Sequence, residues 1–214
     1  MAKLVRMGKG KSKAKIGIYG GVFDPIHNGH LFLAQNAVYL LQLDYLYLVP
    51  CGIPSHKDAP VADASHRMTM AQLGAGRKTL VSDFEINRAL DDVVSYSIDT
   101  VDYFRDQHGE AELCLLIGAD NISEIPTWKN YRGLSDRCRI VATTRPGSDV
   151  STMPLYGKTV YTPYDPSLPI EVLRIPSLNI SSTTIRERVK KRLPIDHMVP
   201  DSVMSYIEKS GLYK

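Results

Sequence analysis

Residues 16–30 read IGIYGGVFDPIHNGH, and this stretch decides the fold class of the 214-residue chain. It begins as a short apolar run, typical of a strand that is covered on both faces. The pair Gly20-Gly21 follows at the strand end, where glycine permits positive φ and lets a ligand approach the backbone closely. A helical pattern with an apolar face begins at Gly29. The stretch therefore predicts a strand, a turn suited to a ligand and the N-terminus of a helix.

The order of strand and helix repeats along the chain. Such repetition is typical of a parallel sheet wound on both faces, with its ligand beyond the carboxyl ends of the strands. We therefore expect an α/β fold, a doubly wound, Rossmann-like parallel sheet of about six strands with helices on both faces and a C-terminal helical end. The expected strands cover residues 16–20, 45–49, 80–86, 113–117, 139–143 and 171–175, and the expected helices cover 29–41, 65–77, 95–107, 183–191 and 202–209.

Composition and charge favour one globular domain with a basic leader. Hydrophobic residues make up 43% of the chain and charged residues 23%, which excludes the composition of a disordered or fibrous protein. Residues 1–14 carry five basic residues and no acidic one, so we expect a disordered leader there and a single domain at 15–214. The rest of the chain contains 21 of the 26 basic residues and all 23 acidic residues, so its net charge is slightly negative. This charge argues against nucleic acid as a partner of the domain. The proline-bearing loops at 50–64 and 146–169 are either binding loops or surface decoration.

Cys51, Cys114 and Cys138 stand far apart, without the spacing of a zinc or redox motif. We interpret them as reduced thiols. No apolar run is long enough to cross a bilayer, and the basic N-terminal residues are not followed by the apolar segment of a signal peptide. These observations predict a cytoplasmic protein without a membrane partner, and they leave its oligomeric state open.

His27 and His30 flank the predicted start of the first helix. Free backbone N–H groups and the helix dipole favour an anion at that position, and two imidazoles there can both donate to one phosphate. Two alternatives remain. The histidines could be structural, or they could form a zinc site with Asp24 as a third ligand. The helix dipole would repel a cation, which favours phosphate.

Residues 180–186, ISSTTIR, form a second such segment after the last expected strand. Hydroxyl residues at a helix start are ordinary N-caps, and Thr184 with Glu187 fits a capping box. Four successive hydroxyls followed by Arg186 also suit a second phosphate site at a second helix N-terminus. Two phosphate sites of this kind suit a nucleoside triphosphate.

The two segments together resemble the signature motifs of the nucleotidylyltransferase superfamily of adenylyltransferases. Further motifs in the same order are similar to those of bacterial nicotinate-nucleotide adenylyltransferases, and the likeness extends over residues 16–210. These further motifs are Val49-Pro50 leading to His56-Lys57, Ser95-Tyr96-Ser97-Ile98-Asp99-Thr100, Leu116-Ile117-Gly118-Ala119-Asp120, Trp128 and Thr144-Arg145-Pro146-Gly147.

The resemblance implies transfer of AMP from ATP to nicotinate mononucleotide, giving deamido-NAD and pyrophosphate, with Mg²⁺ accompanying ATP and no metal site in the protein. It implies that His27 and His30 are catalytic and stabilise charge on the transferring phosphoryl group. The implied ATP-binding residues are Gly20, Gly21, Phe23, His27, His30, Ser181, Thr183 and Arg186. The implied substrate-binding residues are Lys57, Ser97, Asp120, Trp128 and Arg145, with Asp120 on a ribose, Trp128 stacked on the pyridine ring, Ser97 near its carboxylate and Arg145 on a phosphate.

Three positions depart from the family pattern. Val22 stands where Ser or Thr is usual, Ser97 where Thr is common, and Ser55 where a proline usually precedes His56-Lys57. These departures bear on the choice between nicotinate and nicotinamide mononucleotide as the acceptor. Phosphopantetheine is a further alternative acceptor, against which His27 and the Trp128 segment argue. A non-catalytic nucleotide-binding module is the alternative of another class, and Trp128 could be a packing residue instead of a ring platform.

Overall fold

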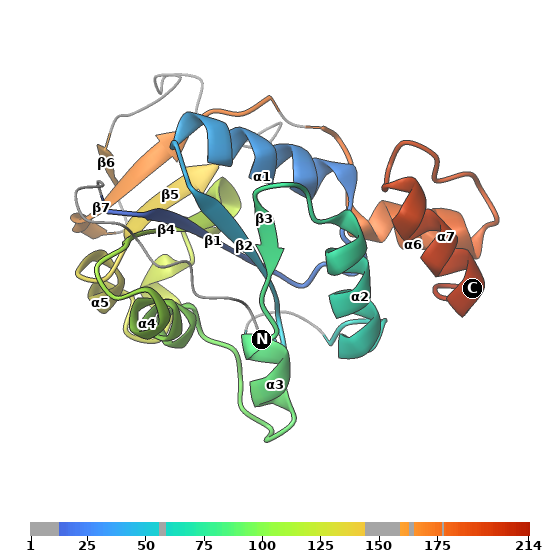
Figure 1. Ribbon diagram of the computed structural model, residues 1–214, viewed down its shortest axis with the longest axis horizontal. Coiled ribbons are helices and arrows are strands. Elements are labelled where there is room, and N and C mark those ends of the chain that lie inside the picture. Colours follow the sequence, from blue (N-terminus) through green and yellow to red (C-terminus); the bar gives the residue numbers. More distant parts are fainter. Residues whose placement is uncertain (1–12, 56–58, 144–158, 163–164, 177) are drawn as a thin grey trace.

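The computed structural model describes residues 13–55, 59–143, 159–162, 165–176 and 178–214 of the chain (Figure 1). The predicted substrate residues Lys57 and Arg145 lie outside the described residues. So do residues 1–12 of the predicted leader. Lys13 and Ala14 are described, and the carbonyl of Ala14 already accepts the N–H of Glu112 beside the sheet.

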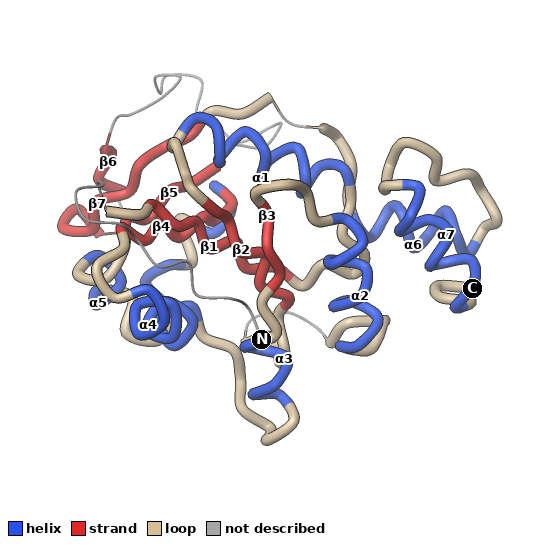
Figure 2. The backbone as a smooth tube through the Cα atoms, viewed as in Figure 1, coloured by secondary structure: helices blue, strands red, loops and turns tan. Residues whose placement is uncertain are grey.

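One mixed sheet with helices on both faces forms the centre of the molecule, which confirms the predicted fold class. Its seven strands have the order β3-β2-β1-β4-β5-β7-β6, and all neighbouring pairs are parallel except β6 and β7. Figure 2 shows the strands together in the middle of the molecule with helices around them. The strands are β1 Lys15–Gly21, β2 Tyr45–Pro50, β3 Thr79–Val81, β4 Glu112–Gly118, β5 Arg139–Thr143, β6 Thr159–Thr162 and β7 Asp165–Leu173. The helices are α1 Asn28–Leu40, α2 Ala64–Gly74, α3 Phe84–Ala89, α4 Ser97–His108, α5 Arg132–Ser135, α6 Ser182–Lys190 and α7 Asp201–Ser210, with 3-10 turns η1 Ala119–Asn121 and η2 Ile125–Thr127.

The period of two along β1 explains why two core clusters form. Ile16 and Ile18 face the cluster that also holds residues of α4 and α5, whereas Tyr19 faces the cluster shared with α1, α2, α6 and α7. Figure 1 shows α1 on one side of the sheet, α4 and α5 on the other, and α6 and α7 beyond its end as the predicted C-terminal helical region. A strand covered on both faces needs apolar residues on both of its sides, and β1 and β4 have them in their buried middle, at residues 16–19 and 113–117.

The predicted strand 80–86 is wrong beyond Val81. β3 ends there, and the chain turns through Ser82 and Asp83 into α3, which begins at Phe84. The hydroxyl of Ser82 accepts the N–H of Phe84 at 3.3 Å, a side-chain contact that satisfies a backbone group at the helix start. The residues predicted as one strand are therefore divided between the short edge strand β3 and the helix α3.

The predicted loop 146–169 contains two strand segments. β6 pairs antiparallel with β7, and β7 begins at Asp165, six residues before the predicted strand at 171. β7 pairs with β5 only from Glu171 onward, so its first part has β6 as its single described strand neighbour. Proline lacks a backbone N–H and is tolerated in a strand where only one neighbouring strand forms hydrogen bonds. This explains why a segment with Pro169 can be part of a strand.

The strand order reverses between β1 and β4, because the chain moves from β1 outward to β3 and then returns to the other side of β1. Ligands of doubly wound sheets bind at such a switch point, beyond the carboxyl ends of the strands. None of the helices in the described ranges is long and apolar enough to cross a membrane.

Candidate active site

A cleft of about 1180 Å³ opens at the carboxyl ends of β1, β2 and β4. It lies at the switch point of the sheet, and its walls come from α1, α4, η1, the residues that flank η2 and the start of α6. Ten of the residues predicted from sequence line it together, namely Gly20, Gly21, Phe23, His27, His30, Ser97, Trp128, Ser181, Thr183 and Arg186. Residues more than 150 positions apart in the sequence therefore share one cleft.

The turn after β1 is strained and tightly packed. Phe23 has φ of +50°, which is unusual for a bulky residue and costs on the order of 1–3 kcal/mol. Its ring folds back over Gly21, where a Cβ would lie 2.7 Å from Cε1 of Phe23, so glycine is required there. The ring also meets His30 edge to face, with centroids 5.1 Å apart. Phe23 is thus a buried support for His30 at the cleft wall.

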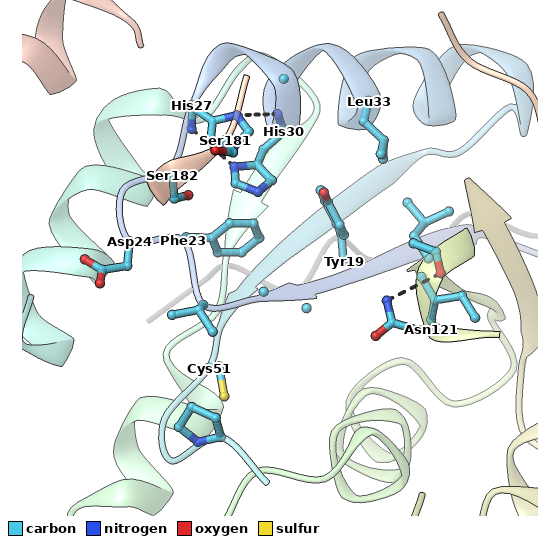
Figure 3. Close-up of a pocket in the computed structure, with 18 of the residues that line it drawn as sticks. Tyr19, Phe23, Asp24, His27, His30, Leu33, Cys51, Asn121, Ser181 and Ser182 are labelled. Atoms are coloured by element: carbon cyan, nitrogen blue, oxygen red, sulfur yellow. Dashed lines mark hydrogen bonds between the residues drawn. The ribbon is translucent and has the colours of Figure 1, made fainter. Parts of the chain in front are cut away.

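His27 and His30 form a reciprocal cap at the start of α1. His27 is the N-cap residue and lies before the helix, where its Nδ1 accepts the N–H of His30 at 3.3 Å. Nδ1 of His30 in turn accepts the N–H of His27 at 3.3 Å, and the two rings stack with centroids 3.6 Å apart (Figure 3). Gly29 makes room for this pair, since a Cβ there would lie 2.9 Å from Nδ1 of His27.

This cap fixes the tautomer of both imidazoles. A ring nitrogen that accepts an N–H group carries no proton, so the neutral rings of His27 and His30 hold their hydrogen on Nε2. Two Nε2–H donors then stand side by side at a helix N-terminus that lines the cleft. Such an arrangement stabilises negative charge on a bound phosphate.

The N-terminus of α6 faces the same end of the cleft. Its N-cap is Ser181, whose Oγ accepts the N–H of Thr184 at 3.1 Å. The expected cap at Thr184 is therefore wrong, because the N-cap lies three residues earlier, at Ser181. The hydroxyl of Ser182 donates to the carbonyl of Pro25 at 2.9 Å and so joins the two helix starts.

Arg186 lies one turn into α6 and reaches the turn after β1. Its Nη1 donates to the backbone carbonyl of Asp24 at 2.7 Å, and its Nη2 donates to Oγ1 of Thr183 at 3.3 Å. The guanidinium is partly buried and lines the cleft. The basic and hydroxyl groups of α6 are thus held against the glycine turn by direct hydrogen bonds.

The carboxylate of Asp24 is engaged away from the histidines. It is 3% exposed and accepts the N–H groups of Val61 at 2.7 Å and Ala62 at 3.2 Å. In Figure 3 its carboxylate points away from Phe23 and His27. The zinc alternative needs Asp24 beside both histidines, and this geometry contradicts it.

The opposite end of the cleft is built by α4 and the segment after η2. Ser97 is the first residue of α4, and Trp128 packs on the core cluster beneath the sheet while it also lines the cleft. Nζ of Lys129 lies 3.1 Å and 3.2 Å from the two carboxylate oxygens of Asp99 in the first turn of α4. This ion pair holds the Trp128 segment beside Ser97.

Of the predicted site residues that the structure describes, Asp120 lies outside the cleft lining. Asp120 is exposed in η1, and its carboxylate lies over Gly118, so that a Cβ on Gly118 would overlap Oδ1 of Asp120. The neighbouring Asn121 lines the cleft instead, and its Nδ2 donates to the carbonyl of Gly118 at 3.4 Å. The sequence pattern of a strand end followed by several polar residues indicates that this region lies near the cleft. It does not indicate which of the polar side chains points into the cleft.

Glu85 also lines the cleft, and it has no counterpart among the predicted site residues. Glu85 is 7% exposed, and burial raises its pKa, while hydrogen bonds from Thr100 and Ser95 partly oppose that rise. Burial together with the charge of Glu85 raises the pKa of Cys51 to about 12, so the thiol stays protonated and unreactive. A signal for Glu85 existed in Ser82-Asp83-Phe84-Glu85, a pattern typical of a helix start.

Fold and site together have the features of nucleotide-binding α/β proteins, in which a helix N-terminus at the switch point of the sheet can bind a phosphate group. The model of the cytidylyltransferase-like family matches residues 18–188 of the chain. The probable nicotinate-nucleotide adenylyltransferase of Clavibacter michiganensis is 40% identical over 204 residues, which cover 94% of this chain and 95% of that protein. The corresponding protein of Moorella thermoacetica is 40% identical over 210 residues, covering 94% and 92%. The chain therefore belongs to the cytidylyltransferase-like family, and within it to the nicotinate-nucleotide adenylyltransferases that these relatives represent.

Solved structures share the fold. The nicotinic acid mononucleotide adenylyltransferase of Plasmodium falciparum, complexed with NaAD, aligns with a TM-score of 0.73 at 21% identity and covers 94% of this chain and 97% of that one. A second structure of the Plasmodium enzyme, complexed with APC, aligns with a TM-score of 0.70 at 20% identity over the same shares of both chains. The likeness extends over nearly the whole sheet and its helices.

Proposed function

We propose that this protein transfers AMP from ATP to nicotinate mononucleotide and releases pyrophosphate and deamido-NAD. The observation that carries the proposal is the shared cleft, in which two helix N-termini with His27, His30 and Arg186 lie at one end and Ser97 and Trp128 at the other. A volume of about 1180 Å³ exceeds that of a site for a single small ligand and suits two nucleotides. Relatives at 40% identity with the same name support it.

The reaction needs positioning and charge stabilisation more than a protein nucleophile. An oxygen of the acceptor phosphate attacks the α-phosphorus of ATP in line, a new P–O bond forms, and the bond to the β-phosphate oxygen breaks to release pyrophosphate. In this proposal the Nε2–H groups of His27 and His30 donate to the α-phosphate as its charge redistributes. Ser181, Thr183 and Arg186 hold the β- and γ-phosphates, and Gly20, Gly21 and Phe23 form the turn against which the two nucleotides meet.

The acceptor would occupy the end of the cleft near α4. Trp128 would stack on the pyridine ring, and the hydroxyl of Ser97 would donate to the ring carboxylate at the start of α4, where the helix dipole also favours an anion. Lys57 and Arg145 are proposed as further contacts to the acceptor on the basis of the sequence alone. Asp120 remains a proposed ribose contact, and it would have to turn from Gly118 toward the cleft.

ATP brings a divalent cation into the site, and we propose that this ion is Mg²⁺. Within the part of the chain that the structure describes, no group of three or more His, Cys, Asp or Glu side chains could hold a metal. The hydroxyl, imidazole and guanidinium donors of the cleft fit phosphate oxygens, which would themselves bind the cation. When bound, the ion neutralises phosphate charge. We further propose a cytoplasmic location, supported by three free cysteines.

The decisive experiment measures pyrophosphate release with ATP and one of three acceptors, which are nicotinate mononucleotide, nicotinamide mononucleotide and phosphopantetheine. Turnover with nicotinate mononucleotide well above that with the other two is the expected result. A preference for nicotinamide mononucleotide or phosphopantetheine would assign another adenylyltransferase activity. ATP binding without pyrophosphate release from any acceptor would support the non-catalytic module.

A further inference from the structure

The end of the chain reaches the turn that carries the site. Tyr213 follows α7, and its hydroxyl donates to Oδ1 of Asp24 at 2.6 Å, across 189 positions of sequence. The ring of Tyr213 packs on the core cluster that α1, α6 and α7 share. Burial and the hydrogen bond to Asp24 raise the pKa of Tyr213, so its hydroxyl stays protonated and remains a donor at neutral pH.

Asp24 connects this hydroxyl to the phosphate end of the cleft. Its carboxylate is buried and accepts three donors, from Val61, Ala62 and Tyr213. Its own carbonyl accepts Nη1 of Arg186 at 2.7 Å, and the same Nη1 lies 4.0 Å from Oδ2. A displaced Asp24 would therefore move the guanidinium that holds the ATP phosphates in the proposed function.

The other contacts of the turn do not replace this bond. Arg67 is 2% exposed and holds the carbonyls of Val22 at 2.9 Å and Ala62 at 3.2 Å, so it braces the backbone beside Asp24. Tyr213 is the side-chain donor that reaches the carboxylate itself at 2.6 Å. Removing one donor from a buried carboxylate leaves charge without its hydrogen bond, which is costly and favours a shift of the group.

We propose that Tyr213 is a positioning residue for ATP, which acts through Asp24 to hold Arg186 and the turn after β1 in the geometry that binds the triphosphate. The inference rests on the proposed function only for the identity of the nucleotide. In this proposal the C-terminal segment contributes to the geometry of the site, although Tyr213 itself contacts no substrate.

The test compares Tyr213→Phe with Tyr206→Phe. Both changes remove one phenolic hydroxyl, and Tyr206 lies on α7, where its hydroxyl meets Nδ1 of His66 at 2.8 Å outside the cleft lining. We expect Tyr213→Phe to weaken ATP binding and raise the KM for ATP about tenfold, the factor that one hydrogen bond of ~1.4 kcal/mol supplies. The KM for the acceptor should change less than about twofold, and Tyr206→Phe should match the wild type in all three measurements.

A second measurement separates positioning from general destabilisation. Asp24→Ala and the double variant complete a cycle in which the loss from Tyr213→Phe should largely vanish once Asp24 is changed, because both act through one bond. Additive losses, or wild-type ATP affinity in folded Tyr213→Phe, would overturn the proposal. ATP affinity is measured by calorimetry without acceptor, so the result stands even if the wild type turns over no nicotinate mononucleotide, an outcome that would sink the proposed reaction alone.

Discussion

Oγ1 of Thr100 donates to Oε1 of Glu85 at 2.6 Å, and this bond joins α4 to α3 directly beneath the cleft. Burial raises the pKa of Glu85 even though Thr100 and Ser95 donate to it. A carboxyl whose pKa is higher in the folded state than in the unfolded state favours folding when it is protonated. That contribution is lost as the pH rises from the ordinary glutamate value toward the raised one.

Glu85→Gln should therefore change how stability depends on pH. The amide resembles the protonated acid, so the variant and the wild type should have similar free energies of unfolding below about pH 4.5. As the pH rises to about 8, the wild type should lose stability relative to the variant. Urea unfolding across this range measures the difference, and Glu208→Gln, at an exposed position of α7, is the control. A difference that stays constant with pH would contradict the buried ionisation.

His30→Ala should lower kcat far more than it raises KM. The variant removes one of the two Nε2–H groups that are proposed to donate to the α-phosphate of ATP. The loss of such a donor to a developing negative charge costs on the order of 100-fold in kcat. It also removes the acceptor of the His27 N–H, so Tm should fall slightly. Steady-state kinetics of the variant measure kcat and KM, with His66→Ala as the control. Normal turnover by a folded variant would show that His30 has no catalytic role.

Arg186→Ala should raise the KM for ATP by about tenfold or more, because a hydrogen bond to a charged group contributes roughly 1.5–3 kcal/mol. Arg188 is the matched control. It lies on the same helix, but its Nε donates to the carbonyl of Pro194, and it does not line the cleft. Arg188→Ala should bind ATP as the wild type does. Equal effects of the two substitutions would mean that α6 contributes through helix stability instead of phosphate contacts.

The choice of acceptor tests the other end of the cleft. The acid and the amide of the pyridine nucleotide have nearly the same shape, so polar donors must separate them. An amide that leaves one donor unpaired costs about 1–3 kcal/mol, and we expect kcat/KM to favour nicotinate mononucleotide by at least about tenfold. Equal efficiency with the two acceptors would refute this specificity.

Two further variants test which contacts produce the preference for nicotinate mononucleotide over the amide. Ser97→Ala should narrow the gap between the acceptors, since it removes a hydroxyl donor. Trp128→Ala should weaken both acceptors by a similar factor, because stacking does not distinguish the acid from the amide, and Trp128→Phe should restore part of the loss. A Ser97→Ala enzyme with unchanged preference would assign the discrimination to backbone N–H groups.

The parallel sheet and the turn at the end of β1 could be predicted from the sequence because their signals are local. Gly20-Gly21 follows a continuous apolar run, and the strand end and helix start that it marks are where the structure has them. The strand predicted through Ile86 failed because the alternating apolar and polar residues of 80–86 fit a strand, although Ser82 and Asp83 also suit the start of a helix. The β6 strand was hidden in a proline-bearing segment, where single-sided pairing tolerates residues that usually mark a loop.

The acceptor end was harder to predict because its geometry is set by tertiary contacts. Nothing in the local sequence indicates that Asp120 folds over Gly118 while Asn121 turns inward. The burial of Glu85 depends on α3 and α4 packing together, and the bond from Tyr213 to Asp24 spans nearly the whole chain. Such contacts follow from the completed fold and carry no signal in the spacing of neighbouring residues.

The hydroxyl of Ser182 and the guanidinium of Arg186 meet Pro25 and Asp24 across 157 and 162 positions. During synthesis on a ribosome, the glycine turn and α1 therefore emerge long before the α6 residues that complete the phosphate site. A growing chain of this protein cannot hold ATP in the way described until α6 has left the exit tunnel. On the proposed function, nucleotide binding by a growing chain should therefore begin only after translation has passed residue 186.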